Sequence, residues 1–202
     1  MAVGTIQRGW ALAKQGQGEE GVVQIRRGLA AYQATEQELF RPGFLALLAE
    51  AYGKVGQAEE GLSALAEALT LVNKTGERWY EAELYRLKGT LTLQSRQVED
   101  KSQASQRQVE DDSENTNPQH PAPSTHAEAE AEACFLKAIE IARKQQAKSL
   151  ELRAVMSLAH LWQNQGKKEE AHEMLVEIYG WFTEGFDTKD LQEAKALLEE
   201  LS

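Results

Sequence analysis

Residues 54–61 read KVGQAEEG, and this segment decides the fold because it recurs twice more in the chain. The copies are KQGQGEEG at residues 14–21 and NQGKKEEA at residues 164–171. In each copy a glycine suits the left-handed cap that ends one helix. The Glu pair suits the first turn of the next helix, where the helix dipole favours negative charge. Each copy therefore predicts a tight turn between two helices.

Apolar residues on both sides of the turn at residues 54–61 have helical spacing. Leu45, Leu48, Ala49 and Tyr52 fall at i, i+3, i+4 and i+7 before it, which predicts an amphipathic helix. The apolar face predicted after the turn comprises Leu62, Leu65, Ala66 and Leu69. The sequence thus predicts two packed helices joined by this turn.

The repeat has a period of about 40 residues, because Gly16 and Gly56 lie 40 residues apart. On this period we predict one all-α domain over residues 1–202, made of helix pairs at 2–37, 42–75, 77–146 and 150–183. Leucines and alanines at helical spacing follow at 188–201. Because an end repeat must cover an otherwise exposed apolar face, we predict that this last helix caps the stack.

A polar stretch interrupts the third pair. Residues 95–125 consist mainly of Gln, Ser, Glu, Asp, Asn and Pro, and they contain no aromatic residue. Such a composition buries too little apolar surface to offset the entropy of ordering, so we predict an insertion in a loop, with partial helix as the alternative. The pentapeptide RQVED occurs at 96–100 and again at 107–111. We interpret this duplication as expansion of a tolerated loop rather than as a binding motif.

The overall composition excludes several classes of protein. The net charge of −10 opposes binding to a nucleic acid or to an anionic membrane. The single cysteine, Cys134, cannot form an internal disulfide, which favours a reducing compartment. Residues 1–5 lack the features of a signal peptide, and no apolar run is long enough to span a membrane. We therefore expect a cytoplasmic protein.

Small residues recur at matching places in the four pairs. Gly9, Ala49, Gly89 and Ala159 occupy one position, and Gly21, Gly61, Ala131 and Ala171 occupy a second one. This pattern resembles the tetratricopeptide (TPR) repeat, although the chain has Ile25 and Leu65 where a large aromatic residue is common and lacks the closing proline. The resemblance implies a right-handed α-α superhelical solenoid whose first helices line a concave groove.

Longer phrases resemble a narrower family. Residues 77–89, ERWYEAELYRLKG, and much of 131–201 are similar to the C-terminal repeat region of bacterial signalling proteins that join a class III adenylate or guanylate cyclase to an AAA/STAND-type ATPase. The resemblance implies a regulatory scaffold that holds a protein, a peptide segment or a covalently attached ATPase or cyclase domain. This chain contains neither catalytic domain, so no activity carries over.

A candidate binding surface follows from the TPR resemblance, because side chains of the first helices that do not pack inward would face a ligand. The candidates are Trp10, Lys14, Glu50, Lys54, Glu83, Arg86, Arg153, Met156, His160, Gln163 and Asn164. The alternative is an ordinary solvated face, with Trp10 and Met156 in the core. We expect Arg86→Glu with Arg153→Glu to abolish partner capture and to leave helicity intact.

We therefore predict a non-catalytic protein–protein interaction module. The alternative is a self-association element that forms homo-oligomers through its ends, near Trp10 or Trp181.

The sequence G-x-G-x-x-G at 16–21 also occurs in dinucleotide-binding sites, but here it follows a helix instead of a strand. No two of His120, His126, His160 and His172 have metal-ligand spacing, so we predict no metal and no cofactor. Cys134 is predicted to be a core residue rather than a nucleophile.

Overall fold

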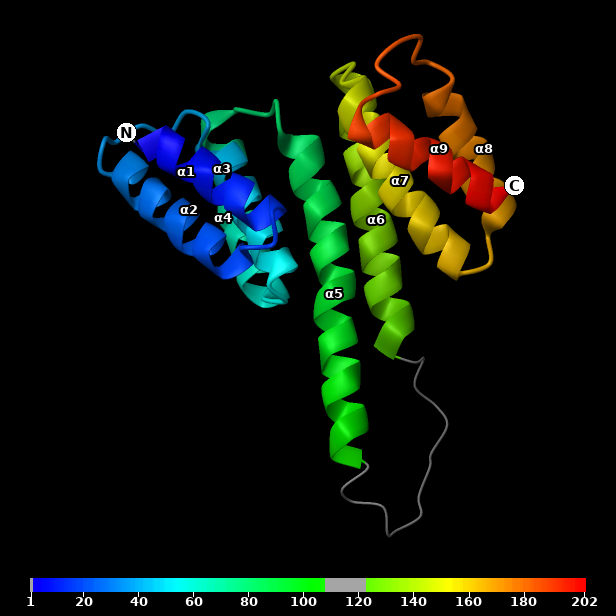
Figure 1. Ribbon diagram of the computed structural model, residues 1–202, viewed down its shortest axis with the longest axis horizontal. Helices are drawn as coiled ribbons and strands as arrows, with labels where there is room; N and C mark the ends of the chain where they lie inside the picture. Colours follow the sequence, from blue (N-terminus) through cyan, green and yellow to red (C-terminus); the bar gives the residue numbers. More distant parts are fainter. Residues whose placement is uncertain (1, 108–122) are drawn as a thin grey trace.

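The chain is all-α, as predicted. The computed structural model describes the backbone of residues 2–107 and 123–202 and the side chains of residues 2–98 and 126–202. These residues form nine helices and no strand, stacked side by side along the molecule (Figure 1). The helices are α1 (Ala2–Lys14), α2 (Gly18–Gln33), α3 (Arg41–Lys54), α4 (Ala58–Thr75), α5 (Glu81–Arg107), α6 (Pro123–Lys144), α7 (Lys148–Asn164), α8 (Lys168–Tyr179) and α9 (Lys189–Leu201). We call α1–α2, α3–α4, α5–α6 and α7–α8 units one to four.

The three recurring segments form the predicted turns. Gly16, Gly56 and Gly166 have φ angles of 88°, 75° and 79°, a left-handed conformation that costs glycine little. After each glycine the next N–H donates to a carbonyl five residues earlier, as in the bond of 3.0 Å from Gln57 to Tyr52. This bond satisfies a carbonyl that the helix end would otherwise leave unpaired.

A fourth turn of this kind joins α6 to α7. Gln146 takes the left-handed conformation there with a φ of 56°, and the N–H of Ala147 donates to the carbonyl of Ala142 at 2.9 Å. This turn falls between the helix pairs predicted at 77–146 and 150–183, but it lacks the recurring phrase because glutamine occupies the position that glycine holds elsewhere.

Small residues allow the two helices of unit one to approach closely. A Cβ atom added to Gly9 would lie 2.7 Å from the carbonyl oxygen of Gly21, which is closer than a side chain permits. The same positions in unit two hold Ala49, which is fully buried, and Gly61. The close packing predicted for these positions is confirmed.

Helix α5 connects the two halves of the hydrophobic core. Leu84, Leu87 and Leu91 belong to the cluster formed with α1–α4. Tyr85 and Leu93 pack against the cluster formed by α6–α9. The final helix α9 buries Leu191, Ala194, Leu197 and Leu201, so it covers the end of the second cluster as predicted.

The face predicted for α4 is wrong in part. Leu65 is fully buried, but Leu62 and Leu69 are only half-buried and Ala66 is exposed. The buried residues of this helix are Ala58, Gly61, Ala64, Leu65, Ala68, Leu71 and Val72. Leu62 and Leu69 still pack against the core from its edge, so Ala66 is the one predicted residue that does not face it. Trp79, which lies at the start of the helix pair predicted at 77–146, precedes α5 and is 49% exposed.

The predicted loop at 95–125 is helical at both ends. Helix α5 continues to Arg107, and α6 begins at Pro123 and runs alongside it (Figure 1). Arg96 stands one 40-residue period after Gly56, so the glycine that stops α3 is absent from α5. The residues that follow include good helix formers such as Gln, Glu, Lys and Ala, so the helix continues. His120 and most of the second RQVED copy lie outside the described residues.

None of the helices in the described part of the chain is both long enough and apolar enough to cross a membrane.

Candidate functional site

The odd-numbered helices α1, α3, α5, α7 and α9 pack next to one another and form one face of the molecule. This face contains a cavity of about 280 Å³, which we call the Arg86 cavity. It is lined by Lys14, Glu50, Arg86, Arg153, Met156, Ser157, His160, Lys189, Asp190 and Glu193. All five helices therefore contribute to a single site.

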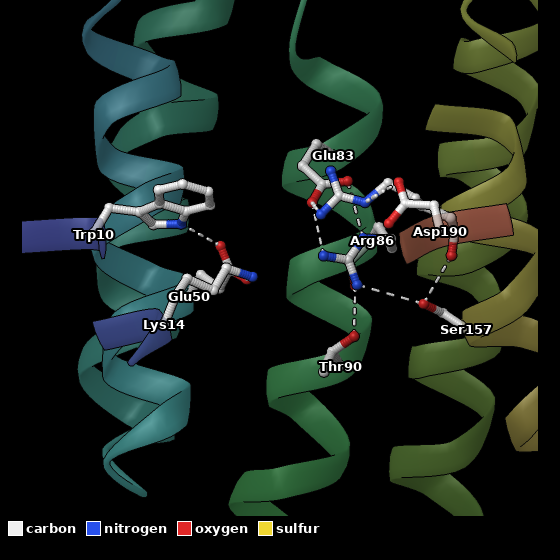
Figure 2. A network of polar contacts seen from close by, with 9 residues as sticks. Trp10, Lys14, Glu50, Glu83, Arg86, Thr90, Ser157 and Asp190 are labelled. Atoms are coloured by element: carbon white, nitrogen blue, oxygen red, sulfur yellow. Dashed lines mark hydrogen bonds and ion pairs between the residues drawn. The ribbon is translucent and has the colours of Figure 1, made fainter. Parts of the chain in front are cut away.

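A buried carboxylate lies beneath the cavity. Glu83 of α5 is only 2% exposed, and it accepts hydrogen bonds from Arg86 Nε at 2.9 Å and Arg86 Nη2 at 2.7 Å (Figure 2). Arg153 of α7 brings its Nη2 to 3.2 Å from the same carboxylate. A buried carboxylate is costly unless it is paired, and two guanidinium groups provide that pairing. Glu83 thus fixes both arginines and connects α5 to α7.

The two arginines are held in place from more than one side. Burial would lower the pKa of Arg86, but the hydrogen bond and charge of Glu83 outweigh this effect and raise it, so the guanidinium stays charged. Arg86 Nη1 lies 3.5 Å from the hydroxyl oxygen of Ser157. Arg153 Nε lies 3.7 Å from Asp190 Oδ2, at the start of α9. The site therefore presents two cations in fixed positions.

Helices α1 and α3 carry a second polar cluster (Figure 2). The indole Nε1 of Trp10 donates to Glu50 Oε2 at 2.8 Å, and Lys14 forms an ion pair with the same carboxylate. Burial alone would raise the pKa of Glu50, but the hydrogen bonds from Lys14 and Trp10 outweigh it and lower the pKa. Glu50 is consequently an anion at neutral pH.

The structure brings together most of the residues that the sequence singled out. Lys14, Glu50, Arg86, Arg153, Met156 and His160 line the Arg86 cavity. Lys54 lines a neighbouring cavity of about 180 Å³, together with Glu50 and Arg86. Gln163 and Asn164 lie at the end of α7 and line neither cavity.

Two of the predicted residues lie deeper than expected. Glu83 is buried under the arginines, and Met156 is 8% exposed and belongs to the core cluster of α6–α9, which is the alternative stated for it. We expected Arg86→Glu to leave the helical fold intact, and this geometry contradicts that expectation. A second carboxylate there would face the buried Glu83, and an unpaired buried charge destabilises a fold strongly.

The sequence analysis missed four lining residues. Ser157 is four residues after Arg153 on α7, so helical spacing could have placed it on the same face. Lys189, Asp190 and Glu193 come from the first turns of α9, which the sequence identified only as a cap. Their position depends on the connection between α8 and α9, and the sequence of that connection has no periodic pattern of apolar residues from which its path could be predicted.

The other chemical candidates have structural surroundings unlike those of reactive groups. Cys134 of α6 is buried, and burial raises the pKa of its thiol. Residues 16–21 connect helix α1 to α2, so no strand precedes the G-x-G-x-x-G sequence. Among the described residues, no three or more His, Cys, Asp or Glu side chains are grouped so as to hold a metal ion.

Solved structures with TPR-like repeats are similar to this chain. The crystal structure of nearly identical TPR-like repeats, assigned to a kinesin light chain of Podosopora anserina, matches 98% of this chain and 83% of its own, with a TM-score of 0.61 and 17% identity. A variant of that protein matches 98% of this chain and 91% of its own, with a TM-score of 0.59 and 17% identity. The chain matches no protein-family model, and it matches none of the curated proteins. The fold is therefore a TPR-like repeat solenoid, as the sequence predicted.

Proposed function

We propose that this chain is a non-catalytic interaction module that binds a protein or peptide segment at the Arg86 cavity. The observation that supports the proposal best is that five helices, from all four units and the cap, converge on this one cavity. Solenoid repeats generally use such extended surfaces, to which each repeat contributes, for binding. The cavity combines cations, anions and a methionine, which suits the mixed polar and apolar character of a peptide.

The wider setting that we propose is a regulatory signalling protein. The phrases at 77–89 and 131–201 support a place beside a bacterial cyclase or ATPase domain, in the cytoplasm, where the module would hold either that attached domain or a separate protein. The Arg86 cavity would be the contact surface in both cases.

A capture experiment tests the proposal. The variant changes three residues whose side chains do not pair with the buried Glu83. The Arg86 cavity is lined by His160 and Lys189, and the neighbouring cavity is lined by Lys54. The variant Lys54→Ala/His160→Ala/Lys189→Ala should lose the partners that the full chain captures, as identified by mass spectrometry.

The matched control removes the same residue types elsewhere. Lys137→Ala/His172→Ala/Lys195→Ala also loses two lysines and one histidine, none of which lines the Arg86 cavity. It should retain the partners. Equal capture by both variants would show that the Arg86 cavity is not needed for partner binding.

Self-association is the second candidate, supported by exposed aromatic residues near the C-terminal end. Trp181 is 57% exposed and Phe186 is 47% exposed. Trp10, the other residue suggested for this role, is half-buried and bonded to Glu50, so it supports the candidate less. A strictly monomeric mass in sedimentation at high micromolar concentration would contradict self-association.

A further inference from the structure

A second cavity lies on the side of α5 opposite to the Arg86 cavity. Lys88, Thr92 and Ser95 lie about half a helical turn away from Arg86 and Thr90, because an α-helix has about 3.6 residues per turn. They line a cavity of about 480 Å³ between α4, α5 and α6, which we call the Thr92 cavity. This volume is in the range of roughly 300–1,000 Å³ found for ligand pockets.

The Thr92 cavity has an apolar centre and two polar ends. Leu62, Ala66 and Leu69 of α4 form one wall, and Ala127 of α6 contributes to the other. These are the same α4 residues that the sequence placed in the core and that the structure leaves partly uncovered.

Each end of the cavity is marked by a polar pair. Lys88 Nζ lies 3.5 Å from Glu130 Oε1 on the α6 side. The Ser95 hydroxyl donates to Glu59 on the α4 side. A group with an apolar body and a polar edge could pack against the leucine side chains and form a hydrogen bond at either end.

The equivalent position holds a larger side chain in each of the other units, and in unit one it is Leu12. Thr92 stands one 40-residue period after Tyr52, and Trp162 is the equivalent residue of unit four once the insertion is allowed for. Tyr52 is buried in the core. Trp162 is half-buried, and its indole Nε1 donates to Glu132 Oε1 of the preceding unit at 3.1 Å. In the same register Leu62 replaces Glu132. Unit three therefore has a small side chain where units two and four have an aromatic ring.

We propose that the Thr92 cavity binds an aromatic side chain of a partner protein, which occupies the place that Tyr52 and Trp162 fill in their own units. The occupant is a planar ring because two of the three equivalent positions, Tyr52 and Trp162, hold rings, and these two belong to the units on either side of unit three. It packs against Leu62 and Leu69, and its polar edge reaches the pairs at Lys88 or Ser95. This site is separate from the Arg86 cavity and does not depend on what binds there.

Titration of the full chain with a capped residue tests the proposal. N-acetyl-L-tryptophanamide added to the ¹⁵N-labelled chain should give saturable amide shifts at Leu62, Thr92 and Ala127. N-acetyl-L-leucinamide should bind at least about tenfold more weakly, since a leucine side chain buries less surface than an indole and has no polar N–H. Equal binding of the two probes, or no saturable shift at these residues, would overturn the proposal.

Two variants locate the site, and a third is the control. Thr92→Trp should fill the cavity as Trp162 does in unit four, and it should reduce binding of the tryptophan probe at least about tenfold. Ala66→Phe does the same from an exposed position of α4, so it remains informative if Thr92→Trp does not fold. Val23→Trp, on the exposed surface of α2, should bind like the unmodified chain. Unchanged binding by Ala66→Phe would contradict the assignment.

A comparison with free indole tests whether the cavity binds a side chain of a partner protein or a small molecule. The capped tryptophan should bind at least as tightly as indole, because a partner's backbone would leave the cavity beside the exposed Ala66. Tighter binding of indole would overturn the assignment to a partner side chain.

Discussion

Units two and three share one repeat frame but differ at three positions that change the structure around α5. Unit two has Gly43, Tyr52 and Gly56, where unit three has Glu83, Thr92 and Arg96, each exactly one period later in the chain. Glu83 fixes the arginines of the Arg86 cavity, Thr92 leaves the second cavity open, and Arg96 lets α5 continue. Few changes within a repeat can therefore add separate features to different sides of one helix.

The largest effect is expected from removal of the buried carboxylate. Glu83→Ala leaves Arg86 and Arg153 without their shared anion, and the loss of one partner from a buried ion pair costs about 3–5 kcal/mol. Urea denaturation followed by circular dichroism measures the change in the free energy of unfolding. Glu67→Ala is the control, because Glu67 pairs with Arg41 at an exposed site, where such pairs contribute less than about 1 kcal/mol. Equal losses in the two variants would show that the Glu83 cluster is not a special feature of unit three.

A smaller effect is expected where unit three departs from its neighbours by a single methyl group. The positions equivalent to Gly89 in units two and four hold Ala49 and Ala159. A Cβ atom added to Gly89 would nevertheless lie 2.6 Å from the Phe135 ring. Gly89→Ala should therefore destabilise the chain by about 1–3 kcal/mol, through overpacking.

Gly4 provides the control for this substitution. A Cβ atom there would meet nothing within 4 Å, so Gly4→Ala should stabilise the chain by up to about 1 kcal/mol through helix propensity. Thermal unfolding compares the two variants. A stabilising Gly89→Ala would contradict the close contact between α5 and α6.

The smallest effect is expected from restoring the glycine of the other units. Arg96→Gly should weaken α5 locally by about 1 kcal/mol, the usual difference between glycine and a good helix former. Hydrogen exchange should then speed up for the amides of residues 97–107, while those of residues 84–91 keep their protection. Unchanged exchange beyond residue 96 would mean that the glycine does not decide where the first helix of a unit ends.

The sequence predicted features that depend on short-range spacing. Gly56 and Glu59 predicted a turn and a helix start from their order alone. The resemblance to TPR repeats placed Lys14, Glu50 and Arg86 on the first helices of their units, on the face toward a groove. The sequence did not predict that Ala66 is exposed, because the rotation of α4 depends on how closely Gly61 approaches α3. It also placed Glu83 at the surface, since its burial requires Arg153, which lies 70 residues further along the chain. Asp190 was missed for the same reason, because its contact with Arg153 depends on the tertiary packing of α9 and on no local pattern.

The most direct test of the proposed function is the affinity for a verified partner, measured by isothermal titration calorimetry. The Kd of Lys54→Ala/His160→Ala/Lys189→Ala should be at least about tenfold higher than that of the unmodified chain, which corresponds to about 1.4 kcal/mol. The Kd of Lys137→Ala/His172→Ala/Lys195→Ala should be unchanged. Equal Kd values for the two variants would contradict the claim that the Arg86 cavity is the binding surface.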